Sequence, residues 1–153
     1  MVRDIRNPYI DREINALRRV TSLNPIPKKE SVREIIKELK ANHGVAILTD
    51  QWSGPDGLWL DFFGEPTSTT SIPARLALRF KSPIVPAYCL RQAPGFYSIE
   101  IHEPVSTEPG DEIEITKRLD ALLETQIRKY PDQWIWAHRR WKSKPRLIRN
   151  TKI

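Results

Sequence analysis

The sequence predicts one α/β domain over residues 1–153, with a mixed sheet flanked by helices. Segments with helical spacing of apolar residues alternate with short apolar segments typical of strands. No internal repeat or long biased linker divides the chain, and thirteen prolines separate the segments. Hydrophobic residues make up 39% of the chain, which is enough to bury a core.

Two helices are expected in the N-terminal third. A strand end over residues 2–5 precedes Asn7-Pro8, which suit the N-cap and first position of a helix. Ser31 and Glu34 have the spacing of a capping box, and apolar residues follow them at helical intervals. These signals predict a second helix to about Asn42.

Four strands and two further helices are expected in the rest of the chain. Short apolar or alternating runs predict strands over residues 45–49, 58–63, 83–90 and 96–101. The last two strands form a hairpin candidate across Pro94-Gly95, and Cys89 is expected to be a small core residue. Ser71 can cap a helix whose buried face is Ile72, Leu76 and Phe80. The longest helical stripe runs from Ile115 to Tyr130 and closes at Pro131.

Composition limits the class of function. The net charge of +6 makes an anionic partner plausible. A single cysteine excludes an internal disulfide framework. One cysteine and three scattered histidines also argue against a structural zinc site, so no metal is expected. No apolar run approaches the roughly 18 residues of a membrane span. Membrane contact is therefore expected to be peripheral or supplied by a segment outside this sequence.

Polar residues at the ends of predicted elements are the candidates for chemistry. Asp50 and Gln51 follow a predicted strand, where ligands gather in open α/β sheets, but Asp50 can equally cap the turn. The hydroxyl-rich loop over residues 67–71 precedes a helix and could hold an anion or only cap that helix. Arg18 and Arg19 could bind phosphate or only complement the helix dipole.

The histidines and the basic tail give weaker signals. His43 is expected to be a turn residue, His102 has no obvious partner, and His138 is expected to be packed or paired. The tail over residues 138–153 carries seven Lys or Arg, and three tryptophans lie in or just before it. These tryptophans could stack on nucleic-acid bases, lie at a lipid surface, or pack the last helix on the sheet.

Residues 131–142 read PDQWIWAHRRWK and are followed by Pro145. This string resembles the C-terminal signature of the bacterial lipid A biosynthesis acyltransferases, close to Pro-Glu-Gln-Trp-x-Trp-x-His-Arg-Arg-Phe-Lys followed by Arg-Pro. The resemblance covers almost the whole chain. Further ordered matches are Arg3, Asn7-Pro8, Asp11, Asp50-Gln51, Phe62-Phe63-Gly64-x-Pro66, Ser68-Thr69, residues 74–77, Thr116, Glu124, Ile127 and Arg128.

The resemblance implies the C-terminal part of a glycerolipid or lipid A acyltransferase-like fold. It implies transfer of a fatty acyl group from acyl carrier protein or acyl-CoA to a hydroxyl of a lipid A precursor, at the cytoplasmic face of the bacterial inner membrane and without a cofactor. In that chemistry a histidine acts as general base, and a carboxylate five positions later orients it. Here the fifth residue after each histidine is Leu48, Thr107 or Ser143. We therefore expect no activity from this chain alone, and the family's membrane anchor is also missing from it.

Residue by residue, the resemblance implies a supporting catalytic carboxylate at Asp50 and an arginine facing the phosphorylated acceptor at Arg18, or at Arg19 in a competing alignment. It places Gln51, Gly64, Ser68 and Thr69 in the substrate-binding part of the site. The signature residues His138, Arg139 and Arg140 are expected to act mainly as structural anchors. Two alternatives stay open: a nucleic-acid or anionic-surface binding module that uses the tail, and a non-catalytic homologue.

Overall fold

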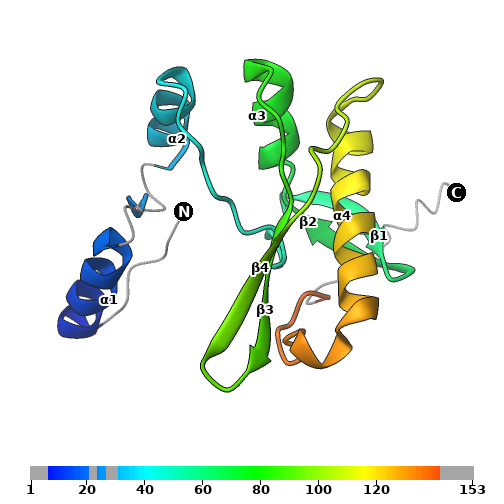
Figure 1. Ribbon diagram of the computed structural model, residues 1–153. Helices are drawn as coiled ribbons and strands as arrows, with labels where there is room; N and C mark the ends of the chain where they lie inside the picture. Colours follow the sequence, from blue (N-terminus) through cyan, green and yellow to red (C-terminus); the bar gives the residue numbers. More distant parts are fainter. Residues whose placement is uncertain (1–6, 21–23, 27–30, 142–153) are drawn as a thin grey trace, which may run out of the picture. The chain divides into compact units, whose positions relative to one another are not determined.

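A computed structural model describes residues 7–20, 24–26 and 31–141. The expected strand end over residues 2–5 and the tail from residue 142 onward lie outside these ranges. The chain divides into two compact units, residues 1–48 and 49–153. The predicted α/β class is confirmed, because helices and strands both build the second unit (Figure 1). Whether both units belong to one domain stays a prediction.

The first unit contains two helices, α1 (Pro8–Val20) and α2 (Ser31–Lys40), as the capping signals predict. The Asn7 carboxamide oxygen accepts hydrogen bonds from the Tyr9 and Ile10 amides, at 3.0 and 3.4 Å. Asn7 is therefore the N-cap of α1. His43 follows α2, and its Nδ1 lies 2.7 Å from the Glu38 carboxylate. None of the helices within the described ranges is long and apolar enough to cross a membrane.

The second unit contains two antiparallel hairpins, each a sheet of two strands, where one mixed sheet was expected. β1 (Leu58–Phe62) pairs with β2 (Glu65–Thr69) across a two-residue turn. Both turn residues, Phe63 and Gly64, have positive φ, 54° and 76°. This geometry matches the twist of the flanking strands. β3 (Ala87–Ala93) and β4 (Phe96–Ile101) form the second hairpin, and the prediction of its turn at Pro94-Gly95 is confirmed.

The strand expected over residues 45–49 is absent. Residues 43–49 have no regular secondary structure, and no strand of the described chain pairs with them. The Leu48 side chain is 80% exposed. The prediction was wrong because an apolar run indicates burial, whereas a strand also needs a neighbour with which to form a hydrogen-bond ladder.

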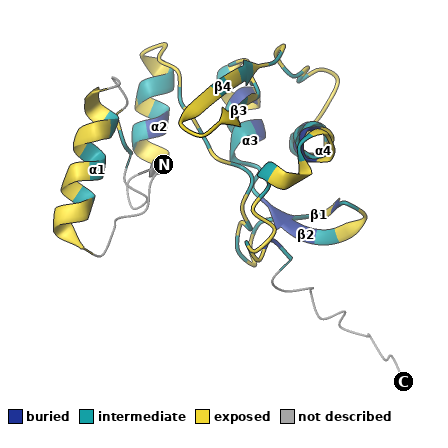
Figure 2. Ribbon diagram, turned by 60° about the horizontal axis from the view of Figure 1, so that its bottom comes forward, coloured by how far each residue is buried: buried dark blue, intermediate teal, exposed yellow. Residues whose placement is uncertain are grey.

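Two helices pack the core of the second unit, α3 (Ile72–Phe80) and α4 (Glu112–Lys129). The Asp111 carboxylate caps α4 by accepting hydrogen bonds from the Ile113 and Glu114 amides, both at 2.9 Å. Ser71 occupies the N-cap position of α3 but makes no capping bond with its side chain. The residues of α3 that are fully buried are Ala74 and Ala77, whereas the expected Ile72, Leu76 and Phe80 are half-buried. Figure 2 shows the buried parts of β2, α3 and α4.

Cys89 is exposed, which corrects the expectation that it belongs to the core. It pairs with Ile99 on a face of the β3–β4 hairpin where the Ile99 side chain is 69% exposed. Leu90, the next residue, points to the opposite face and is buried. On that opposite face, Gln126 of α4 donates to the Glu100 carboxylate at 3.2 Å. Alternation in a strand thus turns Leu90 to the face that meets α4 through Glu100 and leaves Cys89 on the outward face.

Candidate functional site

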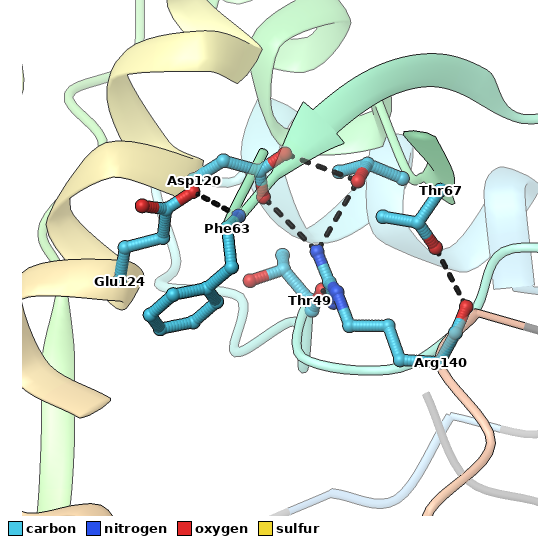
Figure 3. A network of polar contacts seen from close by, with 7 residues as sticks. Thr49, Phe63, Thr67, Asp120, Glu124 and Arg140 are labelled. Atoms are coloured by element: carbon cyan, nitrogen blue, oxygen red, sulfur yellow. Dashed lines mark hydrogen bonds and ion pairs between the residues drawn. The ribbon is translucent and has the colours of Figure 1, made fainter. Parts of the chain in front are cut away.

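The Arg140 side chain is completely buried and joins three segments of the second unit (Figure 3). Its Nη1 donates to the Thr49 carbonyl oxygen at 3.1 Å. Its Nη2 donates to Thr69 Oγ1 at 3.2 Å and to Asp120 Oδ1 at 3.1 Å. The Thr69 hydroxyl in turn donates to Asp120 Oδ2 at 3.0 Å. The guanidinium carbon also lies 4.0 Å from the centre of the Phe62 ring. We call these contacts the Arg140 network.

Local structure explains why these polar groups meet inside the core. Thr67 and Thr69 are two residues apart on β2, so both side chains point to the same face. Thr67 Oγ1 donates to the Arg140 backbone carbonyl at 2.6 Å, and Thr69 contacts the Arg140 side chain. Asp120 lies one turn after the buried Thr116 on α4. β2 and α4 therefore both present hydrogen-bonding groups to the C-terminal segment.

Burial dominates the electrostatics of the Arg140–Asp120 ion pair. Loss of solvent raises the pKa of the Asp120 carboxyl, against the charge of Arg140 and the Thr69 hydrogen bond. Loss of solvent also lowers the pKa of the Arg140 guanidinium, against the charges of Asp120 and then Asp50. A guanidinium stays protonated in proteins, and its charge beside Asp120 favours the ionised form of that carboxyl. Removing one member of such a pair would leave a buried charge without its partner.

The Phe63-Gly64 turn is held by α4. The Phe63 amide donates to Glu124 Oε1 at 2.6 Å, and Glu124 Oε2 accepts from Arg128 Nη2 at 2.8 Å. The Arg128 guanidinium lies 4.7 Å from the centre of the Phe63 ring. Glu124 and Arg128 were matched to the family only by their sequence. The structure gives both residues a role in holding the β1–β2 corner.

The tryptophans of the C-terminal segment contact the same corner. Ring centres of Trp134 and Trp141 lie 6.3 and 5.8 Å from that of Phe62, and Trp136 lies 6.3 Å from Phe63. The Trp136 indole N–H donates to the Pro131 carbonyl at 2.8 Å. Of the three interpretations of this segment, the contacts agree with packing inside the protein.

Asp50 lies next to the Arg140 network. Its Oδ1 is buried and has no hydrogen-bond partner among the described residues, and its charge attracts the Arg140 guanidinium. The turn that follows Asp50 is tied to β2, because the Ser53 amide donates to the Ser68 carbonyl at 3.0 Å. The Ser68 hydroxyl donates to the Gly54 carbonyl. The structure thus brings Asp50 and Ser68 into one part of the second unit.

Ser68 and Thr69 correct one expectation. They belong to strand β2 and not to a loop, and both are buried with partners inside the protein. Pairing with β1 across the Phe63-Gly64 turn makes this segment a strand, which its hydroxyl-rich composition did not indicate. Their role in substrate binding stays a prediction.

The other candidate residues lie at several places. Gln51 is exposed, and Gly64 is exposed in the turn at the opposite end of β2 from Thr69. Arg139 is exposed next to the buried Arg140, and His138 Nδ1 is buried without a hydrogen-bond partner among the described residues. Arg18 and Arg19 occupy the last turn of α1, in the first unit, where Arg18 Nη1 donates to Asn15 Oδ1 at 3.0 Å. Within the described ranges, no three His, Cys, Asp or Glu residues come together as metal ligands would.

Sequence reasoning missed Asp120, and it considered Thr67 only as part of a hydroxyl-rich loop. Asp120 is a carboxylate within the apolar stripe of α4, and Thr116 lies one turn before it on the same face. A charged residue on the buried face of an amphipathic helix requires a buried partner. That rule could have directed attention to Asp120, although not to Arg140 as its partner.

Sequence comparison relates this chain to known proteins. Residues 1–143 match the bacterial lipid A biosynthesis acyltransferase family. A lipid A biosynthesis acyltransferase of Haemophilus influenzae is 27% identical over 91% of this chain and 46% of its own length. The lipid A biosynthesis lauroyltransferase of Escherichia coli is 28% identical, with the same coverage of both chains. A phosphatidylinositol mannoside acyltransferase of Mycolicibacterium smegmatis is 27% identical over 71% of this chain and 36% of its own length.

The chain thus spans about a third to a half of the length of these curated relatives. The match over residues 1–143 extends from the first helix to the signature that contains Arg140. The chain belongs to the bacterial lipid A biosynthesis acyltransferase family.

Proposed function

We propose that this chain takes part in transferring a fatty acyl group from acyl carrier protein or acyl-CoA to a hydroxyl of a lipid A precursor. The match of residues 1–143 to the family is the observation that carries the proposal. In the reaction, the hydroxyl oxygen of the acceptor attacks the thioester carbonyl carbon and the carbon–sulfur bond breaks. The donor leaves as a thiol, and the hydroxyl proton passes through a general base.

This chain would supply the acceptor side of the site. Asp50 would support the reacting groups as a hydrogen-bond acceptor, a role supported by its buried Oδ1, for which the described ranges hold no hydrogen-bond partner. Gln51 and Gly64 would contact the acceptor, while Ser68 and Thr69 would shape the site from inside β2. Arg18 or Arg19 would bind a phosphate of the acceptor, since a guanidinium can grip two phosphate oxygens at once.

We expect the 153-residue chain to be inactive alone. None of its three histidines has Asp or Glu at the fifth following position, so the proposed base is not among them. A positioned base contributes a factor of roughly 10² to 10⁴ in rate. We also propose peripheral contact with the cytoplasmic face of the bacterial inner membrane, supported by the net charge of +6. The same charge would steer acidic acyl carrier protein toward the chain.

A chimeric enzyme tests this function. Residues 1–143 would replace the segment of the Escherichia coli lauroyltransferase that they match. Acyl carrier protein thioester and a lipid A precursor would be supplied, and the acylated lipid measured by mass spectrometry. We expect turnover by the chimera, about 10² less turnover after Asp50→Asn, and none by the isolated chain. A well-folded chimera without turnover, or an Asp50→Asn variant at full rate, would contradict the proposal.

A further inference from the structure

The Arg140 side chain holds the backbone one residue before Asp50. Its Nη1 donates to the Thr49 carbonyl at 3.1 Å, between residues 91 positions apart in sequence. Thr49 ends the segment that forms no strand ladder in the described chain, so no sheet hydrogen bond fixes its carbonyl. A buried guanidinium does this instead, while its Nη2 donates to Thr69 and Asp120.

Strand β2 holds the chain on the other side of Asp50. The Ser53 amide donates to the Ser68 carbonyl at 3.0 Å, and the Ser68 hydroxyl donates to the Gly54 carbonyl. Ser68 itself is completely buried. The turn that contains Asp50 is thus tied to core atoms before and after the carboxylate. Two tethers this close restrict the backbone at Asp50, and with it the directions open to its carboxylate.

The two carboxylates near Arg140 have different surroundings. Asp120 accepts hydrogen bonds from Arg140 Nη2 and from the Thr69 hydroxyl. Asp50 acts on the guanidinium by charge, and its buried Oδ1 has no hydrogen-bond partner within the described part of the chain. Asp120 is thus occupied in the core. Asp50 has a favourable charge beside it and an oxygen that can still accept a hydrogen bond.

We propose that Arg140 is the positioning residue for Asp50 in acyl transfer. It holds the Thr49 carbonyl, fixes the direction of the next side chain, and leaves one Asp50 oxygen to accept a hydrogen bond from the reacting groups. The role of Asp50 rests on the proposed function, whereas its placement by Arg140 is a property of the fold. Arg140 thus acts through Asp50 and does not touch substrate.

Nuclear magnetic resonance of the full 153-residue chain tests the placement. Arg140→Lys keeps the charge but lacks the planar fork that reaches Thr49 and Asp120 together. The matched control is Thr67→Val, which removes the 2.6 Å bond to the Arg140 backbone carbonyl and leaves the guanidinium in place. We expect the Asp50 and Gln51 amide resonances to move in Arg140→Lys and to stay in place in Thr67→Val. Equal changes in both variants, or none in Arg140→Lys, would overturn the proposal.

The wild-type chain gives a second readout if Arg140→Lys does not fold. A buried, hydrogen-bonded guanidinium has Nη protons that exchange slowly with water. Nuclear Overhauser contacts should connect these protons to the Asp50 Hα, because the Asp50 Cα lies on the same side of the trans peptide bond as the Thr49 carbonyl oxygen that they bind. A guanidinium without these contacts would overturn the proposal.

Kinetics of the chimera then test the link to Asp50. Arg140→Lys should lower kcat about 10²-fold with little change in KM, as expected for a misplaced reacting group. Combined with Asp50→Asn, it should cost nothing further, because the two residues act as one unit. For Thr67→Val combined with Asp50→Asn, the fold-losses in kcat of the two single variants should multiply instead. If the losses in kcat of Arg140→Lys and Asp50→Asn multiply in the double variant, the proposal is overturned. A chimera without any turnover would contradict the proposed function, and the resonance measurements would then decide the placement.

Discussion

The Phe63 backbone amide donates to the Glu124 carboxylate at 2.6 Å, joining the β1–β2 turn to α4 across 61 residues of sequence. Phe63 has a left-handed backbone with φ of 54°, which is uncommon for a bulky residue. The hydrogen bond from α4 and the ring contacts of Phe63 with Phe62 and Trp136 accompany this conformation. The turn thus depends on a contact with α4 as well as on its own glycine.

Glu124→Ala should destabilise the protein by about 1.5–3 kcal/mol, the usual contribution of a hydrogen bond to a charged group. The variant leaves the Phe63 amide without its acceptor. Arg128→Ala is the comparison variant: it removes the exposed partner of Glu124 and the guanidinium over the Phe63 ring, but it keeps the hydrogen bond to the Phe63 amide, and it should cost about 1 kcal/mol or less. Urea unfolding followed by tryptophan fluorescence measures both variants. Similar losses would show that the Phe63 contact adds little.

Gly64→Ala should cost about 1 kcal/mol of stability. A new Cβ at Gly64 would meet no atom within 4 Å, so the loss would come from the backbone φ of 76° alone. Gly44→Ala is the control, because its Cβ also meets nothing within 4 Å and its φ lies outside the left-handed range. Thermal unfolding of the two variants separates backbone strain from the general effect of replacing glycine. A neutral Gly64→Ala would mean that the turn relaxes.

Glu100 should make stability depend on pH in the acidic range. A hydrogen bond from Gln126, followed by the charge of Lys129, lowers the pKa of the Glu100 carboxyl below its ordinary value of 4.5. Because the pKa is lower in the folded protein, the stabilisation is fully present at a pH above the pKa of the unfolded chain. It is lost as the pH falls through the pKa of the folded protein. Glu100→Gln should therefore be less stable than wild type at neutral pH, and the difference should shrink below pH 4.5. A difference that is the same at every pH would contradict this.

The chain should prefer an anionic membrane or an acidic carrier protein over nucleic acid. Three tryptophans that could stack on bases contact Phe62 and Phe63 instead, so base stacking would have to displace them. Lys and Arg near an anionic surface each contribute about 1 kcal/mol. Binding to phosphatidylglycerol vesicles, acyl carrier protein and single-stranded DNA would be compared at one ionic strength. Tightest binding to DNA, with quenched tryptophan fluorescence, would favour the nucleic-acid alternative.

Features predicted correctly from the sequence depend on neighbouring residues. The cap at Asn7 and the hairpin turn at Pro94-Gly95 are examples, since each follows from the conformations that a few adjacent residues allow. Errors occurred where a distant segment decides the outcome. Residues 45–49 pair with no strand in the part of the chain that the structure describes, and Cys89 lies on the outward face of its hairpin.

The candidate site shows the same limit. The family resemblance identified Asp50 and Arg140 as separate matches, but no local pattern relates one to the other. Their relation depends on Asp120 and Thr69, which come from α4 and β2. Pairing of a buried charge is a tertiary property, so only the fold could disclose it.

The two threonines of β2 also determine how the C-terminal segment is threaded. Thr67 donates a hydrogen bond to the backbone carbonyl of Arg140, and Thr69, two residues later, accepts one from its side chain. A slip of the segment by one residue would bring Arg139 or Trp141 to this point. Arg139 would have to leave its exposed position. The single N–H of a Trp141 indole could not donate to both Asp120 and Thr49. Packing of three tryptophans on an aromatic corner is compatible with several registers of the C-terminal segment, whereas the hydrogen bonds of the Arg140 guanidinium are made in one register.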